Sequence, residues 1–160
     1  MAFPSDRVYS FDINLLLSDN TAAYTSTGFS QVAGANAILD MGGNQGTTPL
    51  QQARIDAVAV IDVTAIKISA GNESYKLMLL GSNDPNFGAG NVDMLGELML
   101  GKGAARDGVN MKDSVVGRYE LPFMTQQGGN IYEYVALYIV EAGTAPSISL
   151  SAFVAVLVEP

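Results

Sequence analysis

Acidic side chains are the residues of this sequence best suited to catalysis. Two carboxyl groups that face each other across a cleft can hydrolyse a glycosidic bond without histidine. Carboxylates on strands, however, lie mostly on solvated faces, and aromatic residues, which would stack on a sugar, make up only 8% of the chain. The sequence therefore disfavours a carboxylate hydrolase. The candidates in or beside apolar segments are Asp56, Asp62, Glu73, Glu97, Glu120 and Glu133.

The chain contains no histidine and no cysteine. The missing histidine removes the commonest general base and metal ligand, and with it every Ser-His-Asp or Cys-His arrangement. The missing cysteine excludes disulfides, zinc–thiolate sites and thiol nucleophiles. We therefore expect no catalytic, cofactor or metal-ligating residues, and a protein that is not an enzyme.

One loop, residues 83–91, carries oxygen side chains at calcium-like spacing. Asp84, Asn86 and Gly88 resemble the first half of an acidic calcium loop. No glutamate follows at the distance that a bidentate ligand requires, and Pro85 stiffens the loop. Asp, Asn, Pro and Gly are also the residues that a β-turn needs, and we favour that interpretation.

Three tyrosines, Tyr132, Tyr134 and Tyr138, fall on one parity of an apolar segment. Tyrosine is enriched in protein interfaces, so this row could form a recognition surface. The simpler interpretation, which we favour, is that the rings pack at the core or rim of a sheet with their hydroxyls reaching solvent.

The charge balance bears on the class of partner. The chain carries 8 basic and 16 acidic residues, a formal net charge of −8, with no basic cluster. Nucleic acids and anionic membranes both require positive charge on their partner, so we expect neither. No apolar run is long enough to span a bilayer and the first residues carry no signal-peptide pattern, so we expect synthesis in the cytosol.

Apolar alternation with a period of two predicts an all-β fold. The pattern is clearest at residues 147–159, and the density of β-branched residues is greatest at 53–69, where we expect a bend near Thr64 and Ala65. About eight strands with turn signals between them predict a single antiparallel jelly roll or β-sandwich. The other expected strands are 37–40, 73–82, 94–100, 118–123 closed by Pro122, and 131–140, with a further one within 1–20.

The domain division is correspondingly simple. Residues 1–20 are expected to form an N-terminal arm or a first strand, and residues 21–160 the jelly-roll domain. Within the arm, residues 6–18 could either pair locally or cross to a neighbouring subunit. Residues 21–36, rich in Thr, Ser, Ala and Gly, are expected to be loop or weak strand.

Several segments, in order along the chain, carry a resemblance to a known family. They are residues 10–19, 71–75, 80–84, 87–88, 117–119, 121–123, 132–140 and 142–144. Together they resemble the capsid cement, or decoration, proteins of tailed bacteriophages, of the type found in a Bordetella podophage. The resemblance spans roughly residues 8–155.

The resemblance implies a structural virion protein that binds the outer surface of an HK97-fold capsid and cements neighbouring capsomers. It implies the major capsid protein as partner, a homo-oligomer with a dimer favoured over a trimer, and no enzymatic site. A separate hypothesis from the residues alone is a carbohydrate-binding β-sandwich that uses Tyr132, Tyr134 and the 83–91 loop.

Overall fold

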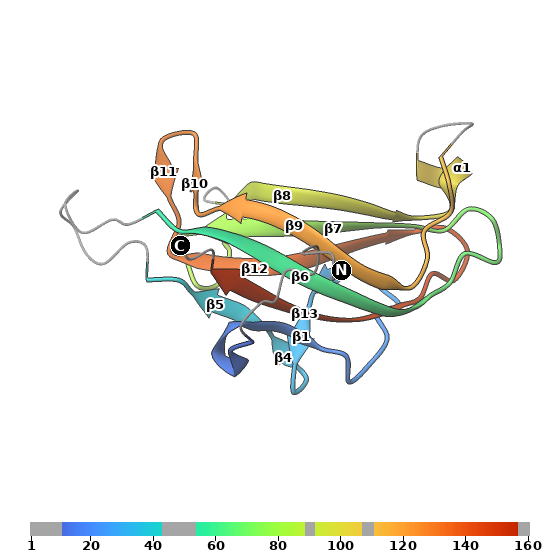
Figure 1. Cartoon of the computed structure of the whole chain (residues 1–160), viewed down its shortest axis with the longest axis horizontal. Helices are drawn as coiled ribbons and strands as arrows, with labels where there is room; N and C mark the ends of the chain where they lie inside the picture. Colours follow the sequence, from blue (N-terminus) through green and yellow to red (C-terminus); the bar gives the residue numbers. More distant parts are fainter. Residues whose placement is uncertain (1–10, 43–53, 89–91, 107–110, 157–160) are drawn as a thin grey trace, which may run out of the picture.

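The computed structural model describes residues 11–42, 54–88, 92–106 and 111–156. They form one two-layered β-sandwich (Figure 1). In chain order the elements are η1 (Ile13–Leu15), β1 (Leu16–Asp19), β2 (Gly28–Phe29), β3 (Gln31–Val32), β4 (Ala35–Asn36), β5 (Ile38–Asp40), β6 (Asp56–Ile66), β7 (Ser74–Ser82), β8 (Val92–Gly101), α1 (Gly103–Arg106), β9 (Gly117–Met124), β10 (Gln126–Gln127), β11 (Asn130–Ile131), β12 (Tyr134–Ala142) and β13 (Ile148–Val156).

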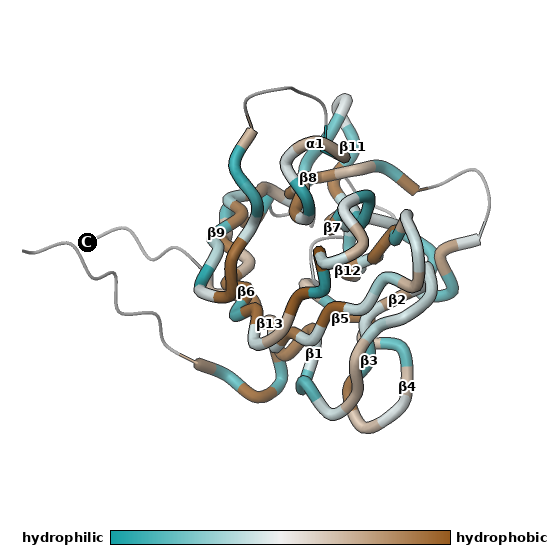
Figure 2. Tube along the Cα trace, turned by 90° about the vertical axis from the view of Figure 1, so that its right-hand side faces the viewer, coloured by the Kyte–Doolittle hydropathy of each residue, from teal (hydrophilic) through white to brown (hydrophobic). Residues whose placement is uncertain are grey.

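The strand pairing is nested, first with last. β1 pairs with β13, β2 and β5 with β12, β6 with β9, and β7 with β8, all antiparallel. The result is a four-stranded sheet, β1-β13-β6-β9, facing a five-stranded sheet, β2-β12-β7-β8 with β5 also on β12. Figure 2 shows the two sheets end on. This order, in which one long hairpin is wound into two sheets, is that of a jelly roll, as the sequence predicted.

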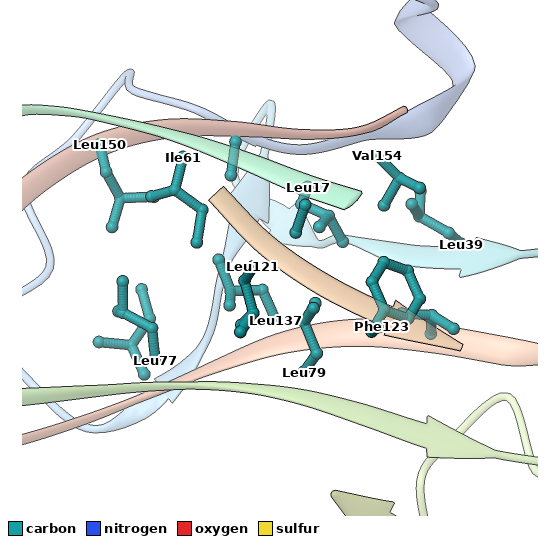
Figure 3. Packing of buried hydrophobic residues seen from close by; sticks show 14 of the residues in the cluster. Leu17, Leu39, Ile61, Leu77, Leu79, Leu121, Phe123, Leu137, Leu150 and Val154 are labelled. Atoms are coloured by element: carbon teal, nitrogen blue, oxygen red, sulfur yellow. The ribbon is translucent and has the colours of Figure 1, made fainter. Parts of the chain in front are cut away.

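The core lies between the two sheets and follows from the alternation of each strand. Ile61 and Leu150 point from the four-stranded sheet toward Leu77 in the other (Figure 3). Leu77, Leu79, Leu137 and Ile139 are all fully buried. Because successive side chains of a strand point to opposite faces, this core fixes which residues lie on the outer face of each sheet.

The longest strand, β6, contains the bend that its sequence predicted. Ser149 pairs with Ala65 but Leu150 pairs with Val63, so Thr64 is the extra residue of a β-bulge. A bulge bends a strand and increases its local twist. It thereby lets an 11-residue strand stay within the sandwich.

Pro122, in contrast, does not close β9, as the sequence had suggested. It lies inside the strand, opposite Val58 of β6. Proline cannot donate a ladder hydrogen bond and is confined in sheets largely to edge strands and bulges. β9 is the edge of its sheet, which explains why the strand continues.

The described residues contain thirteen strands rather than about eight. The excess consists of very short pieces: the second strand of the jelly roll is divided into β2 and β5, and β3–β4 and β10–β11 are two small hairpins. Part of the Thr-, Ser- and Gly-rich segment 21–36 is therefore strand. The predicted N-terminal strand corresponds to β1, while residues 1–10 lie outside the described part of the chain.

Candidate interaction face

The outer face of the five-stranded sheet carries a continuous set of apolar side chains, most of them half-buried. Its strands alternate core residues such as Leu79 and Leu137 with outward ones such as Leu80 and Tyr138. We call this surface the aromatic–methionine face. Its apolar members are Phe29, Ile38, Met78, Leu80, Met94, Met99, Tyr134, Tyr138 and Val140. Ala136 shares their outward direction but has no exposed surface.

Aromatic rings gather at one border of this face. Phe29 of β2 lies directly opposite Tyr138 of β12, and their ring centroids are 4.9 Å apart in an edge-to-face arrangement. Phe87, from the turn after β7, adds a third ring with its centroid 5.5 Å from that of Phe29. Edge-to-face pairs of this kind stabilise each other beyond simple burial, so the border is a preorganised aromatic patch.

Charge on the aromatic–methionine face is sparse. On β7, β8 and β12 the outward positions of the described ladder carry one ion pair, between Lys76 and Glu97, with 3.4 Å between nitrogen and oxygen. Asp40 lies at the rim, on β5. Met94 of β8, the edge strand of the sheet, is 48% exposed, so the face is open to solvent at that edge. A nearly neutral surface rich in Met, Tyr and Phe has the composition of a protein interface.

The structure separates the tyrosines that the sequence placed in one row. Tyr132 is buried just before β12, and its hydroxyl is hydrogen-bonded to the Asp93 carboxylate. Tyr134 and Tyr138 lie half-buried on the aromatic–methionine face. Tyr132 therefore contributes to the fold, whereas the other two contribute to the face.

Carboxylates that the sequence singled out have local partners. Asp62 accepts two hydrogen bonds from the Arg118 guanidinium, at 2.7 and 2.8 Å, which lowers the pKa of Asp62. Asp56 pairs with Arg54 and Glu97 with Lys76. These contacts are ion pairs on the sheet surfaces, with no two of these three carboxylates sharing a partner. Glu120 lies on β9, and Glu133 immediately precedes β12.

Glu73 differs from these, because it is buried where the chain turns into β7. Burial acts to raise its pKa, but hydrogen bonds from the backbone N–H groups of Ala70 and Gly71 outweigh that effect and lower it. The ionised carboxylate thus closes the 70–73 turn, which is a structural role.

Asp84 in the calcium-like loop also serves the backbone. Its carboxylate accepts hydrogen bonds from the N–H groups of Asn86 and Gly88, which lower its pKa. This is the turn chemistry that the sequence favoured. The described residues bring together no group of three acidic side chains suited to a metal ion, and none of their helices is long and apolar enough to cross a bilayer.

A shallow groove adjoins the aromatic border. It has a volume of about 460 Å³ and is lined by hydroxyl, amide and aromatic groups without a charged side chain. The hydroxyl of Tyr24 is held in place by Ser18 and by the N–H of Gln31. Sequence reasoning did not find this groove, because its wall comes from the segment that lacked any periodic pattern. The polar and aromatic side chains of the lining are Tyr24, Thr25, Ser26, Thr27, Phe29, Gln31, Asn36 and Tyr138.

Comparison with known proteins adds no relative. The chain matches no family model, no curated protein and no solved structure. The function must therefore be argued from the face and the groove.

Proposed function

We propose that this protein is a structural cement protein that binds the outer surface of a tailed-phage capsid as a homodimer. The observation that carries the proposal is the aromatic–methionine face, a nearly neutral apolar surface on a chain of net charge −8. Large exposed apolar patches on soluble proteins mark interaction sites. The resemblance to phage cement proteins supplies the identity of the assembly.

The occupant of this face in our proposal is a second copy of the same chain. Two strongly acidic molecules repel each other over most of their surface, and the aromatic–methionine face is where that repulsion is weakest. Met78, Leu80 and Tyr138 are outward neighbours on two central strands, so they can pack against the same residues of a two-fold partner. An isologous contact of this kind is the commonest in homo-oligomers.

Dimerisation explains how the protein would cement a shell. A dimer presents two identical copies of every remaining surface, so it can contact two capsomers at once. Linking two weak contacts makes the second one intramolecular and raises the overall affinity without any new contact. The protein would therefore reside on the outer surface of the virion, with the major capsid protein as its partner, and perform no chemistry there.

The test combines mass measurement with shell binding. Met78→Asp places a charge at the centre of the face, so we expect a monomer in light scattering and at least a tenfold loss of retention on expanded shells of the source phage. Met111→Asp is the matched control, since Met111 is 51% exposed but lies outside the face. A wild-type protein that is monomeric and ignores the shells would contradict the proposal.

Neutral saccharide binding is a second candidate, favoured by the uncharged groove beside Phe29 and Tyr138. Hydroxyl and amide groups next to aromatic rings are suited to a sugar. Unlike the site expected from sequence, this one excludes Tyr132, which is buried. In an NMR titration, neutral hexose oligosaccharides should cause saturable chemical-shift changes at Thr27 and Asn36, and the Tyr138→Ala substitution should abolish these changes. Absence of any shift at millimolar sugar would rule this function out.

A further inference from the structure

The aromatic–methionine face is not uniform across its strands, which run in the order β2, β12, β7 and β8 (Figure 2). The rings of Phe29, Phe87 and Tyr138 form the aromatic border, at the β2 side. Met94 and Met99 occupy outward positions of β8 and form a methionine border at the other side. The face therefore carries two different apolar surfaces along its opposite borders.

Phe87 differs from the other two rings because its backbone is strained. Its φ of 51° lies in the left-handed region, which is unfavourable for a bulky side chain. The conformation is held by Asp84, whose carbonyl accepts a hydrogen bond from the Phe87 N–H and whose carboxylate accepts one from the N–H of Gly88. Glycine adopts this conformation without steric cost, so the turn itself does not require phenylalanine. Strain of this kind persists where the side chain has a role.

The turn that carries Phe87 folds back along the sheet. β7 ends at Ser82, which lies opposite Tyr134. The Phe87 ring, however, contacts Phe29, which lies opposite Tyr138. Tyr138 is four residues along β12 from Tyr134, a distance of about 13 Å. The ring therefore lies over the sheet rather than beyond its end, and Phe87 remains partly exposed there.

Two identical faces can pack on each other in two symmetric ways. In such a dimer the two-fold axis lies in the plane of contact, and each surface meets its own copy. If the axis runs across the strands, β8 of one copy lies over β8 of the other. If it runs along the strands, β8 of each copy lies over β2 of the other. The first arrangement joins like borders, and the second joins unlike borders.

Charge and side-chain chemistry both favour the second arrangement. Glu97 is an outward acid of β8. In the first arrangement the two copies of Glu97 would approach each other in apolar surroundings, and such a juxtaposition of like charges is unfavourable. In the second, each Glu97 lies over the aromatic border, which carries no acid. The same arrangement places thioether groups against aromatic rings, which is a favourable contact.

This inference rests on the dimer proposed above and specifies its geometry. We propose that the two-fold axis runs along the strands, so that Phe29 and Phe87 of each copy pack against Met94 and Met99 of the other. Each contact then occurs twice. The strained Phe87 supplies an aromatic anchor, a type of residue that often dominates the binding energy of an interface.

Cross-linking tests this geometry, and the chain has no cysteine that would give a background. Chains with Phe87→Cys and Met94→Cys, carrying different tags, are mixed and treated with a short bis-maleimide. We expect the mixed product, linked from 87 to 94, to dominate over both homotypic products. Phe29→Cys is used in parallel, since removing the Phe87 ring itself weakens the dimer. Met111→Cys, at an exposed site outside the face, replaces Met94→Cys in the control and should give little product.

The possible results separate this inference from the dimer itself. A wild-type chain that is monomeric in analytical ultracentrifugation would contradict both. If the wild type is dimeric, a dominant product linked from 94 to 94 would show that the axis runs across the strands. A dimer that gives no linked product from either aromatic position would have its contact elsewhere. Either of these two results would overturn the inference alone.

The strain at Phe87 provides a second test. Phe87→Gly and Phe87→Ala remove the same ring, but only glycine relieves the left-handed backbone. We expect the Tm of the glycine variant to be about 2–4 °C above that of the alanine variant. Both variants should raise the dimer Kd roughly tenfold or more. An unchanged Kd in both would show that Phe87 lies outside the interface and would overturn the inference.

Discussion

At the scale of single residues, two glutamates near Tyr75 have opposite electrostatic environments. Glu141 lies opposite Tyr75 on β12, and both of its carboxylate oxygens are buried without a hydrogen-bond partner among the described residues. Burial raises the pKa of Glu141. Glu73, held by backbone N–H groups, has a lowered pKa. Both carboxylates, after burial itself, act to raise the pKa of the Tyr75 hydroxyl.

These shifts act on stability in separate pH ranges. For Glu141, whose folded pKa exceeds the unfolded value near 4.5, the contribution is greatest below that value and is lost as the pH rises through the folded pKa. For Glu73, whose folded pKa lies below 4.5, the contribution is present above that value and is lost as the pH falls through the folded pKa. As the pH rises above about 4.5, the free energy of unfolding therefore declines because of Glu141, and as the pH falls below that value it declines because of Glu73.

Replacing Glu141 should make the first effect visible. Glu141→Gln removes an unpartnered buried charge, which costs on the order of 1 kcal/mol or more, so we expect a Tm about 2–4 °C higher at pH 7 and little change at pH 4. Glu97→Gln, which alters a surface ion pair, should leave Tm within about 1 °C because such pairs contribute little. A lower Tm for Glu141→Gln at pH 7 would show that its carboxylate has a stabilising partner.

At the scale of elements, two glycines at one end of the sandwich allow the backbone of neighbouring segments to approach closely. Gly101 ends β8 with φ 120°, and a Cβ there would lie 2.4 Å from the carbonyl oxygen of Glu73. Gly143, after β12, has φ 110°, and a Cβ there would lie 2.5 Å from the carbonyl oxygen of Asn72. Both conformation and space therefore exclude a side chain where these strand ends meet the turn before β7.

Alanine at either glycine should be strongly destabilising. We expect Gly101→Ala and Gly143→Ala each to lower the free energy of unfolding in urea by about 2 kcal/mol or more. Gly28→Ala is the matched control, because nothing lies within 4 Å of its Cβ position and its φ is not in the left-handed region. A change at Gly143 as small as that at Gly28 would mean that the turn relaxes easily.

The long strands were predictable from sequence because their alternation is strong. The bend near Thr64 was predictable because the apolar segment 53–69 is long for a single regular strand. The divided second strand was not, since β2 and β5 are two or three residues long in a segment of small polar residues. The aromatic–methionine face was missed for a different reason. Both parities of β12 are apolar, so periodicity cannot decide which side faces the core.

At the scale of the whole molecule, the proposed dimer joins two chains of net charge −8 through nearly neutral faces. Their mutual repulsion acts outside the interface and is screened by salt, with a Debye length of about 10 Å at 0.1 M and 3 Å at 1 M. Raising NaCl from 50 to 500 mM should therefore lower the dimer Kd roughly three- to tenfold. Analytical ultracentrifugation measures this, and a Kd that rises with salt would indicate an interface held by ion pairs instead.

The nested pairing of first strand with last also has a kinetic consequence. Ser18 of β1 donates a hydrogen bond to the carbonyl of Leu150, 132 residues away in sequence. The chain between these two strands must lose conformational entropy before their contacts can form, and this cost slows folding. During synthesis β1 lacks its ladder partner until β13 leaves the ribosome, so the native fold cannot form before then. A truncated chain ending before β13 should therefore remain open to proteases.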